Sequence, residues 1–172
     1  MDQTGRAHVN PSDVQFDTKA SRAAYALRAW LIAAVPSLLY FFALVSIGAD
    51  SLRPPARSLD AVVAGYSILG APLLETALML PLASLLKLTL PRPERVRIIL
   101  LAAIGALAHR IGGGWPQVLA SFWPFLIYSV TMTTWLKRSQ KEAFVLTATV
   151  HALYNATFVG VGAIGALVTA AA

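Results

Sequence analysis

Long apolar stretches separated by short polar segments dominate the pattern of this sequence. A helix needs about 20 apolar residues to cross the roughly 30 Å of hydrocarbon in a bilayer. Five stretches approach or exceed this length, and we predict a spanning helix in each, at residues 30–47, 61–86, 98–115, 117–135 and 143–168. The pattern therefore predicts an all-α integral membrane protein, with a bundle of about five transmembrane helices within residues 24–172. Residues 1–23 form a polar N-terminal tail.

The composition agrees with this interpretation, because 57% of the 172 residues are hydrophobic and only 13% are charged. The tail lacks the short apolar core and the small-residue cleavage site of a signal peptide, so we interpret it as cytoplasmic. The chain contains no cysteine, which excludes disulfides, thiolate metal sites and a cysteine nucleophile. Pro72 and Pro81 predict kinks in the second span.

The basic residues predict how the chain is oriented. Of the 14 lysines and arginines, all except Arg53, Arg57 and Arg110 precede the first span or follow the second and fourth. Because basic residues concentrate on the cytoplasmic side, the N-terminus should lie in the cytoplasm and the C-terminus outside. The net charge of +6 suits contact with anionic lipid headgroups and, without a soluble basic domain, does not indicate nucleic acid binding. We expect a multi-pass protein of a bacterial inner (plasma) membrane.

The carboxylates and imidazoles within the apolar spans are Glu75 in the second, His109 in the third and His151 in the fifth, with Asn155 one helical turn after His151. Ionisable groups at membrane depth are costly and usually mark functional sites, although each could instead form a hydrogen bond between packed helices. At about 1.5 Å per helical residue, the four lie roughly 12–18 Å from the cytoplasmic ends of their spans. We therefore predict that they meet in one site.

Small residues line one face of the third and fifth spans, and such residues let membrane helices approach closely. They are Ala102, Gly105, Ala106, Ala152, Ala156 and Gly160. We predict that both faces pack against neighbouring helices and bring the polar side chains into contact.

A carboxylate and two imidazoles in a cavity shielded from bulk water can activate a water molecule by general acid–base catalysis. His151 and Asn155 are four residues apart on one helix face, where both can donate hydrogen bonds to a developing oxyanion. Other intramembrane hydrolases do not fit: the sequence has neither a His-Glu-x-x-His nor a Gly-x-Ser-Gly motif, and Asp50 and Asp60 lie in or beside a loop. The pattern favours amide hydrolysis that uses a glutamate and histidines without a covalent nucleophile, and we predict no cofactor.

The motifs that carry these residues resemble those of the CPBP intramembrane glutamic proteases, which include the type II CAAX prenyl endopeptidases and many bacterial Abi-like proteins. That family has a Glu-Glu-x-x-x-Arg motif after a proline, then Phe-x-x-x-His, then His-x-x-x-Asn. The stretch APLLETALML places Glu75 at the first glutamate, and GALAH places His109 at the second motif. HALYN places His151 and Asn155 at the third. The resemblance covers residues 71–158.

The resemblance implies a role for each residue. Glu75 would activate water with the help of His109, while His151 and Asn155 would stabilise the oxyanion. No metal would be required, and the substrate would be a membrane-anchored protein or peptide. The oligomeric state and the identity of the substrate are not predicted.

The sequence departs from the family pattern at three positions. Thr76 stands at the second glutamate, Leu80 at the arginine and Gly105 at the aromatic residue, so the charged pair that would brace the site is missing. These departures favour a first alternative, a non-catalytic scaffold, regulatory or immunity protein that keeps the fold. A second alternative is a small proton-coupled transporter that uses Glu75 and the histidines as a relay.

Overall fold

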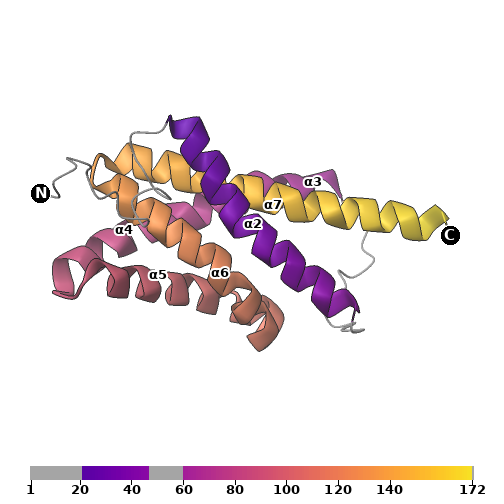
Figure 1. The fold of residues 1–172 in the computed structure, drawn as a ribbon, viewed down its shortest axis with the longest axis horizontal. Helices are drawn as coiled ribbons and strands as arrows, with labels where there is room; N and C mark the ends of the chain where they lie inside the picture. Colours follow the sequence, from indigo (N-terminus) through magenta and orange to yellow (C-terminus); the bar gives the residue numbers. More distant parts are fainter. Residues whose placement is uncertain (1–20, 47–59, 172) are drawn as a thin grey trace, which may run out of the picture.

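The computed structural model describes residues 21–46 and 60–171, which are almost entirely helical and contain no strand. The elements are α2 (Arg22–Ser46), α3 (Ala61–Gly65), the π-helix η2 (Tyr66–Gly70), α4 (Ala71–Thr89), α5 (Glu94–Ala108), α6 (Arg110–Leu136) and α7 (Gln140–Ala171) (Figure 1). The all-α prediction is thus confirmed for the described residues. Most of the predicted tail lies outside them.

Three helices in the described part of the chain are long and apolar enough to cross a membrane: Arg22–Ser46, Ala61–Thr89 and Gln140–Val168. They coincide with the first, second and fifth predicted spans. Their outward faces carry large apolar side chains, such as Leu88, which is 85% exposed. Apolar surface on this scale suits contact with lipid rather than water. These features indicate a helical membrane protein.

The third and fourth predicted spans take a different form. α5 has 15 residues and is about 22 Å long at 1.5 Å per residue, which is less than the usual hydrocarbon thickness. The prediction of one helix through residue 115 is wrong, because α5 ends at Ala108 with His109 as its cap. α6 is then interrupted at Gly114, whose φ of 66° only glycine adopts readily. After this break the chain runs back along α5 (Figure 1).

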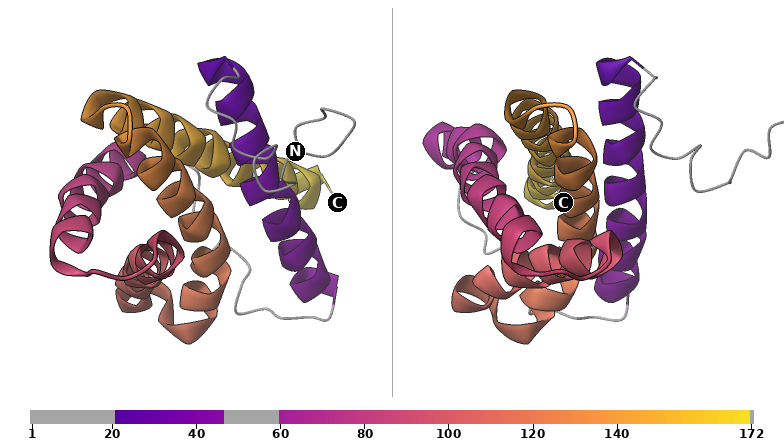
Figure 2. Two further views of the ribbon diagram at one scale, coloured as in Figure 1. Left: turned by 60° about the vertical axis from the view of Figure 1, so that its left-hand side comes forward. Right: turned by 90° about the vertical axis from the view of Figure 1, so that its left-hand side faces the viewer.

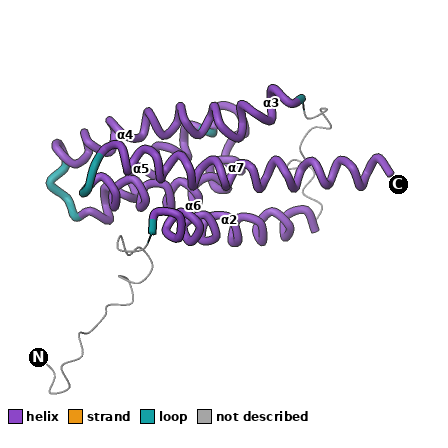
Figure 3. Tube along the Cα trace, turned by 90° about the horizontal axis from the view of Figure 1, so that it is seen from above, coloured by secondary structure: helices purple, strands orange, loops and turns teal. Residues whose placement is uncertain are grey.

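α6 lies at the centre of the bundle and packs against α2, α5 and α7, while α4 packs against α5 and α7 (Figure 2). The core between these helices contains large buried side chains, among them Trp135, Tyr128, Met132 and Leu101. The rings of Tyr25 and Trp135 meet edge to face at 5.2 Å between centroids and join α2 to α6. α7 runs along the bundle, and its C-terminal end extends beyond the other helices (Figure 3).

Two ion pairs lie where helices begin and end. Arg22 bonds to Glu142 and joins the start of α2 to the start of α7. Lys137 lies 2.8 Å from Glu94 and joins the end of α6 to the start of α5. Exposed pairs of this kind contribute at most about 1 kcal/mol each. They show, however, that the helix ends rich in basic residues lie together at one end of the bundle.

The helix formed by α3, η2 and α4 contains a π turn just before Pro72. In this turn the N–H of Ala71 donates to the carbonyl of Tyr66, five residues back. At the same spacing, the partner of the Ser67 carbonyl would be the N–H of residue 72, which proline lacks. The Ser67 carbonyl is thereby left for another donor. π turns of this kind often occur at functional sites.

Candidate active site

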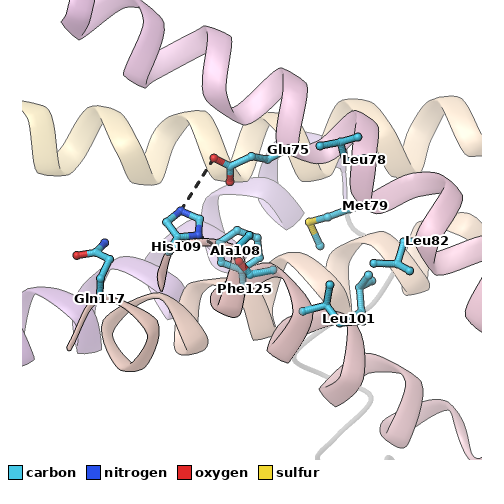
Figure 4. A pocket seen from close by; sticks show the side chains of 11 residues that line it. Glu75, Leu78, Met79, Leu82, Leu101, Ala108, His109, Gln117 and Phe125 are labelled. Atoms are coloured by element: carbon cyan, nitrogen blue, oxygen red, sulfur yellow. Dashed lines mark hydrogen bonds and ion pairs between the residues drawn. The ribbon is translucent and has the colours of Figure 1, made fainter. Parts of the chain in front are cut away.

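Glu75 projects from α4 toward the junction of α5 and α6 (Figure 4). Its Oε1 lies 4.0 Å from Nε2 of His109, and its Oε2 lies 3.7 Å from Nε2 of His151. Both distances exceed a direct hydrogen bond and fall within the span of a bridging water. Helices α4 and α7 and the α5–α6 junction therefore bring three of the four predicted residues together around one carboxylate.

His109 caps both α5 and α6, with φ −77° and ψ −7°. Its Nδ1 lies 3.1 Å from the carbonyl of Gly105, one turn earlier on α5. Because a carbonyl only accepts hydrogen bonds, Nδ1 carries the hydrogen of this bond. In the neutral imidazole, Nε2 is then an acceptor and points toward Glu75.

When Glu75 is ionised and His109 is neutral, the carboxylate and Nε2 are two acceptors that face each other across 4.0 Å. Two acceptors that face each other need a proton or a donor between them. A water molecule meets this need, because it can donate one hydrogen to the carboxylate and one to the imidazole. This is the arrangement from which a general base removes a proton.

His151 is 3% exposed on α7. Its ring stacks on Tyr128 at 4.3 Å between centroids and meets the edge of Phe125 at 5.9 Å. Neither Nδ1 of His151 nor Oε2 of Glu75 has a hydrogen-bond partner among the described residues, although both atoms are buried. Buried polar atoms of this kind are rare in folded proteins and are typical of sites that bind a further polar group.

Asn155 lies one turn beyond His151 on α7, as predicted, but its amide has a structural partner. Nδ2 donates to the free carbonyl of Ser67 at 2.7 Å. The bond fastens α7 to the π turn that precedes Pro72. Asn155 still lines a cavity together with His109 and His151, so one hydrogen of its NH₂ group remains for a ligand.

Two aromatic residues of α6 complete the site, and sequence reasoning missed both. Phe125 meets His109 edge to face at 5.1 Å as well as contacting His151, and Tyr128 stacks on His151. The Phe125 ring occupies the space beside Gly105, where an added Cβ would lie only 2.1 Å from Cδ1. The aromatic contact to His109 therefore comes from α6 rather than from position 105. In the sequence both residues look like ordinary apolar positions of a span.

Two cavities meet at this site. One, of about 590 Å³, lies between α4, α5 and α6 and is mainly apolar; its lining includes Leu78, Met79, Leu82, Leu101 and Ile104 (Figure 4). The other, of about 310 Å³, lies between α2, α6 and α7; the residues of its lining with polar atoms include Ser37, Tyr40, Ser121, Tyr154 and Asn155. Both are lined by His109, Gln117 and Phe125. Gln117 is a polar residue at the start of the fourth predicted span, so the sequence could have indicated that it belongs to the site.

The small residues of the two predicted faces differ in how closely other helices pack against them. Ala102 and Ala106 of α5 are fully buried, in agreement with close packing. On α7, an added Cβ at Gly160 would meet no described atom within 4 Å. Neighbouring helices therefore pack closely against α5 beside the site. The close packing against α7 does not extend as far as Gly160.

Two of the three positions that depart from the family pattern, Thr76 and Leu80, lie in the packed interior. Thr76 is completely buried, and its hydroxyl has no partner among the described residues. Leu80 packs against the hydrophobic core. The place where a charged pair would brace the site is thus filled by core packing. No group of three or more potential metal ligands is present in the described ranges 21–46 and 60–171.

Comparison with protein-family models, with curated proteins and with solved structures finds no match for this chain.

Proposed function

We propose that this protein is an intramembrane endopeptidase of the glutamic type, a divergent relative of the CPBP proteases, that hydrolyses a peptide bond in a membrane-associated protein or peptide. The observation that carries the proposal is the position of Glu75. Its two carboxylate oxygens face the Nε2 atoms of His109 and His151 at 4.0 and 3.7 Å. A carboxylate between two imidazoles, beside a cavity, is suited to general-base activation of water.

In the proposed reaction, a water between Glu75 and His109 transfers a proton to the Glu75 carboxylate while its oxygen attacks the peptide carbonyl carbon. A C–O bond forms, and the carbonyl electron pair moves to oxygen, which gives a tetrahedral oxyanion. Hydrogen bonds from His151 and Asn155 stabilise this anion. Collapse of the intermediate breaks the C–N bond, and Glu75 returns the proton to the leaving amine.

The two cavities support a substrate of mixed polarity. An apolar side chain fits the cavity of about 590 Å³ between α4, α5 and α6. The polar peptide backbone fits the cavity of about 310 Å³ that contains Asn155 and Tyr154. Because His109 lines both cavities, a peptide that occupies them places its backbone at the catalytic group.

The proposal includes the finer topology, in which α5 and α6 also lie within the membrane and the N-terminus is cytoplasmic. Its support is the cluster of basic helix ends at one end of the bundle, where Arg22 pairs with Glu142 and Lys137 pairs with Glu94. By the positive-inside rule this end faces the cytoplasm. A multi-pass protein of a bacterial inner membrane is the corresponding location.

A comparison of protein N-termini tests the proposal. Membranes are prepared from cells that produce the wild-type protein, Glu75→Gln or the matched control Glu142→Gln, which alters a carboxylate of α7 outside the site. We expect a set of new N-termini in the wild type and the control that Glu75→Gln lacks. If Glu75→Gln is inserted at wild-type levels and yields the same N-termini, Glu75 is not the general base and the proposal is wrong.

A non-catalytic role is the second candidate, and two observations favour it. The amide of Asn155 makes a structural hydrogen bond to Ser67. Thr76 is buried and Leu80 packs against the hydrophobic core, so neither position carries a charge beside the site. A scaffold of this kind would keep its cellular effect in Glu75→Gln and lose it when helix packing is disrupted, for example in Ala106→Leu. The two variants therefore separate the candidates.

A further inference from the structure

A second polar cavity lies near the basic end of the bundle, away from the candidate active site. Its charged lining comes from three helices: Lys87 in the last turn of α4, Glu94 and Arg97 on α5, and Lys137 at the end of α6. At about 1.5 Å per residue, Lys87 is roughly 18 Å along the helix from Glu75. The cavity therefore belongs to neither the proposed reaction nor its substrate path.

The charges that line this cavity do not balance. Nζ of Lys137 lies 2.9 and 2.8 Å from the two Glu94 oxygens, so these side chains neutralise each other. Lys87 and Arg97 remain, and no described carboxylate pairs with either. Nη1 of Arg97 donates to the carbonyl of Arg92, which holds the guanidinium in place while its other N–H groups stay available. Two positive charges thus face one small cavity.

The size and the surroundings of the cavity indicate what it can hold. Its volume of about 70 Å³ has room for a group the size of a phosphate but not for a whole lipid. Its remaining lining is largely apolar and includes Ala83, Leu86, Leu101 and Leu136. An anion seated here would have the apolar side chains of Leu86, Leu101 and Leu136 beside it.

We propose that this cavity binds the phosphate group of an anionic membrane lipid. Arginine and lysine are the side chains that recognise phosphate, arginine through paired N–H groups and lysine as a point charge. Basic pockets between membrane helices at the cytoplasmic side bind acidic headgroups. The lipid chains lie along the apolar side chains that border the cavity, such as Leu86 and Leu136. Free inorganic phosphate has the same anionic chemistry but no hydrocarbon chain that could pack against that apolar surface.

The test uses the full chain in neutral detergent and counts bound lipid by native mass spectrometry. Phosphatidylglycerol, phosphatidylcholine and inorganic phosphate are added in separate arms. We expect phosphatidylglycerol to bind better than phosphatidylcholine. Each basic residue near an anionic surface contributes roughly a fivefold factor, so Lys87→Gln and Arg97→Gln should each weaken binding about fivefold and the double variant about 30-fold.

Arg95→Gln is the matched control, because Arg95 lies two positions before Arg97 on α5 and does not line the cavity. It should bind lipid like the wild type, and the charge-conserving Lys87→Arg should do the same. An equal loss in Arg95→Gln would show a diffuse surface effect and overturn the proposal. Displacement of the lipid by millimolar inorganic phosphate would show that the site takes free phosphate instead. Circular dichroism confirms that each variant is folded.

Discussion

Replacement of Gly105 by alanine should destabilise the protein, although a helical glycine is normally improved by this change. In a helix interior, glycine is about 1 kcal/mol less favourable than alanine. At position 105, however, the new Cβ would lie 2.1 Å from Cδ1 and 2.4 Å from Cε1 of Phe125. Ordinary van der Waals contact begins at 3.4 Å, so the ring has to move.

The Phe125 ring has little room to move. It is 4% exposed and lies between His109, Tyr128 and His151, at centroid distances of 5.1, 5.4 and 5.9 Å. Overpacking of this kind costs about 1–3 kcal/mol. After the gain in helix propensity is subtracted, we expect Gly105→Ala to lower the free energy of unfolding by up to about 2 kcal/mol.

Gly160→Ala provides the matched control, because an added Cβ there meets no described atom within 4 Å. The control should gain up to about 1 kcal/mol, so the two variants should differ by the overpacking cost of about 1–3 kcal/mol. The assay is reversible unfolding in mixed micelles, followed by circular dichroism. Phe125→Leu in the Gly105→Ala background should recover part of the loss. Equal stability of Gly105→Ala and Gly160→Ala would refute the close contact at Phe125.

Three further substitutions test other parts of the site. Glu75→Gln should lower the rate of peptide hydrolysis by about 10²–10⁴-fold, the usual contribution of a general base, with the wild-type unfolding free energy retained. Thr76→Val should be neutral or stabilising in the same unfolding assay, because it replaces a completely buried hydroxyl that has no partner among the described residues. Asn155→Ala should destabilise the protein by about 1–3 kcal/mol, because the carbonyl of Ser67 loses its donor; an unfolding free energy equal to that of the wild type would contradict the bond.

The sequence predicted the helical class and the residues that meet at Glu75, because both depend on features with a clear physical signal. Apolar length marks a span, and ionisable residues inside a span are costly enough to be conspicuous. The end of α5 at Ala108 was missed because the length expected of a span, rather than the polar pair His109 and Arg110, set its predicted end. What ends the helix is the local geometry at His109, followed by the left-handed backbone at Gly114.

The contacts around the histidines could not be predicted for a different reason. Phe125 and Tyr128 are apolar residues of a predicted span, and only the packing of α6 against α5 and α7 shows that they face inward. The partner of Asn155 depends on the register of the π turn, since a shift of one residue would satisfy the Ser67 carbonyl within the helix. Hydrophobicity patterns carry no information on that register.

The bond between Asn155 and Ser67 raises the question of whether Asn155 also stabilises the oxyanion, and a double substitution separates the two roles. Pro72→Ala supplies the N–H that the Ser67 carbonyl lacks at the spacing of the π turn. The combination Pro72→Ala with Asn155→Ala should therefore recover much of the stability that Asn155→Ala loses. If Asn155 donates to the oxyanion, hydrolysis should stay reduced by about 10²–10³-fold in the double variant, the usual effect of losing one such donor. Recovery of both stability and hydrolysis would show that the asparagine serves only to hold α7 against the π turn that precedes α4, the helix of Glu75.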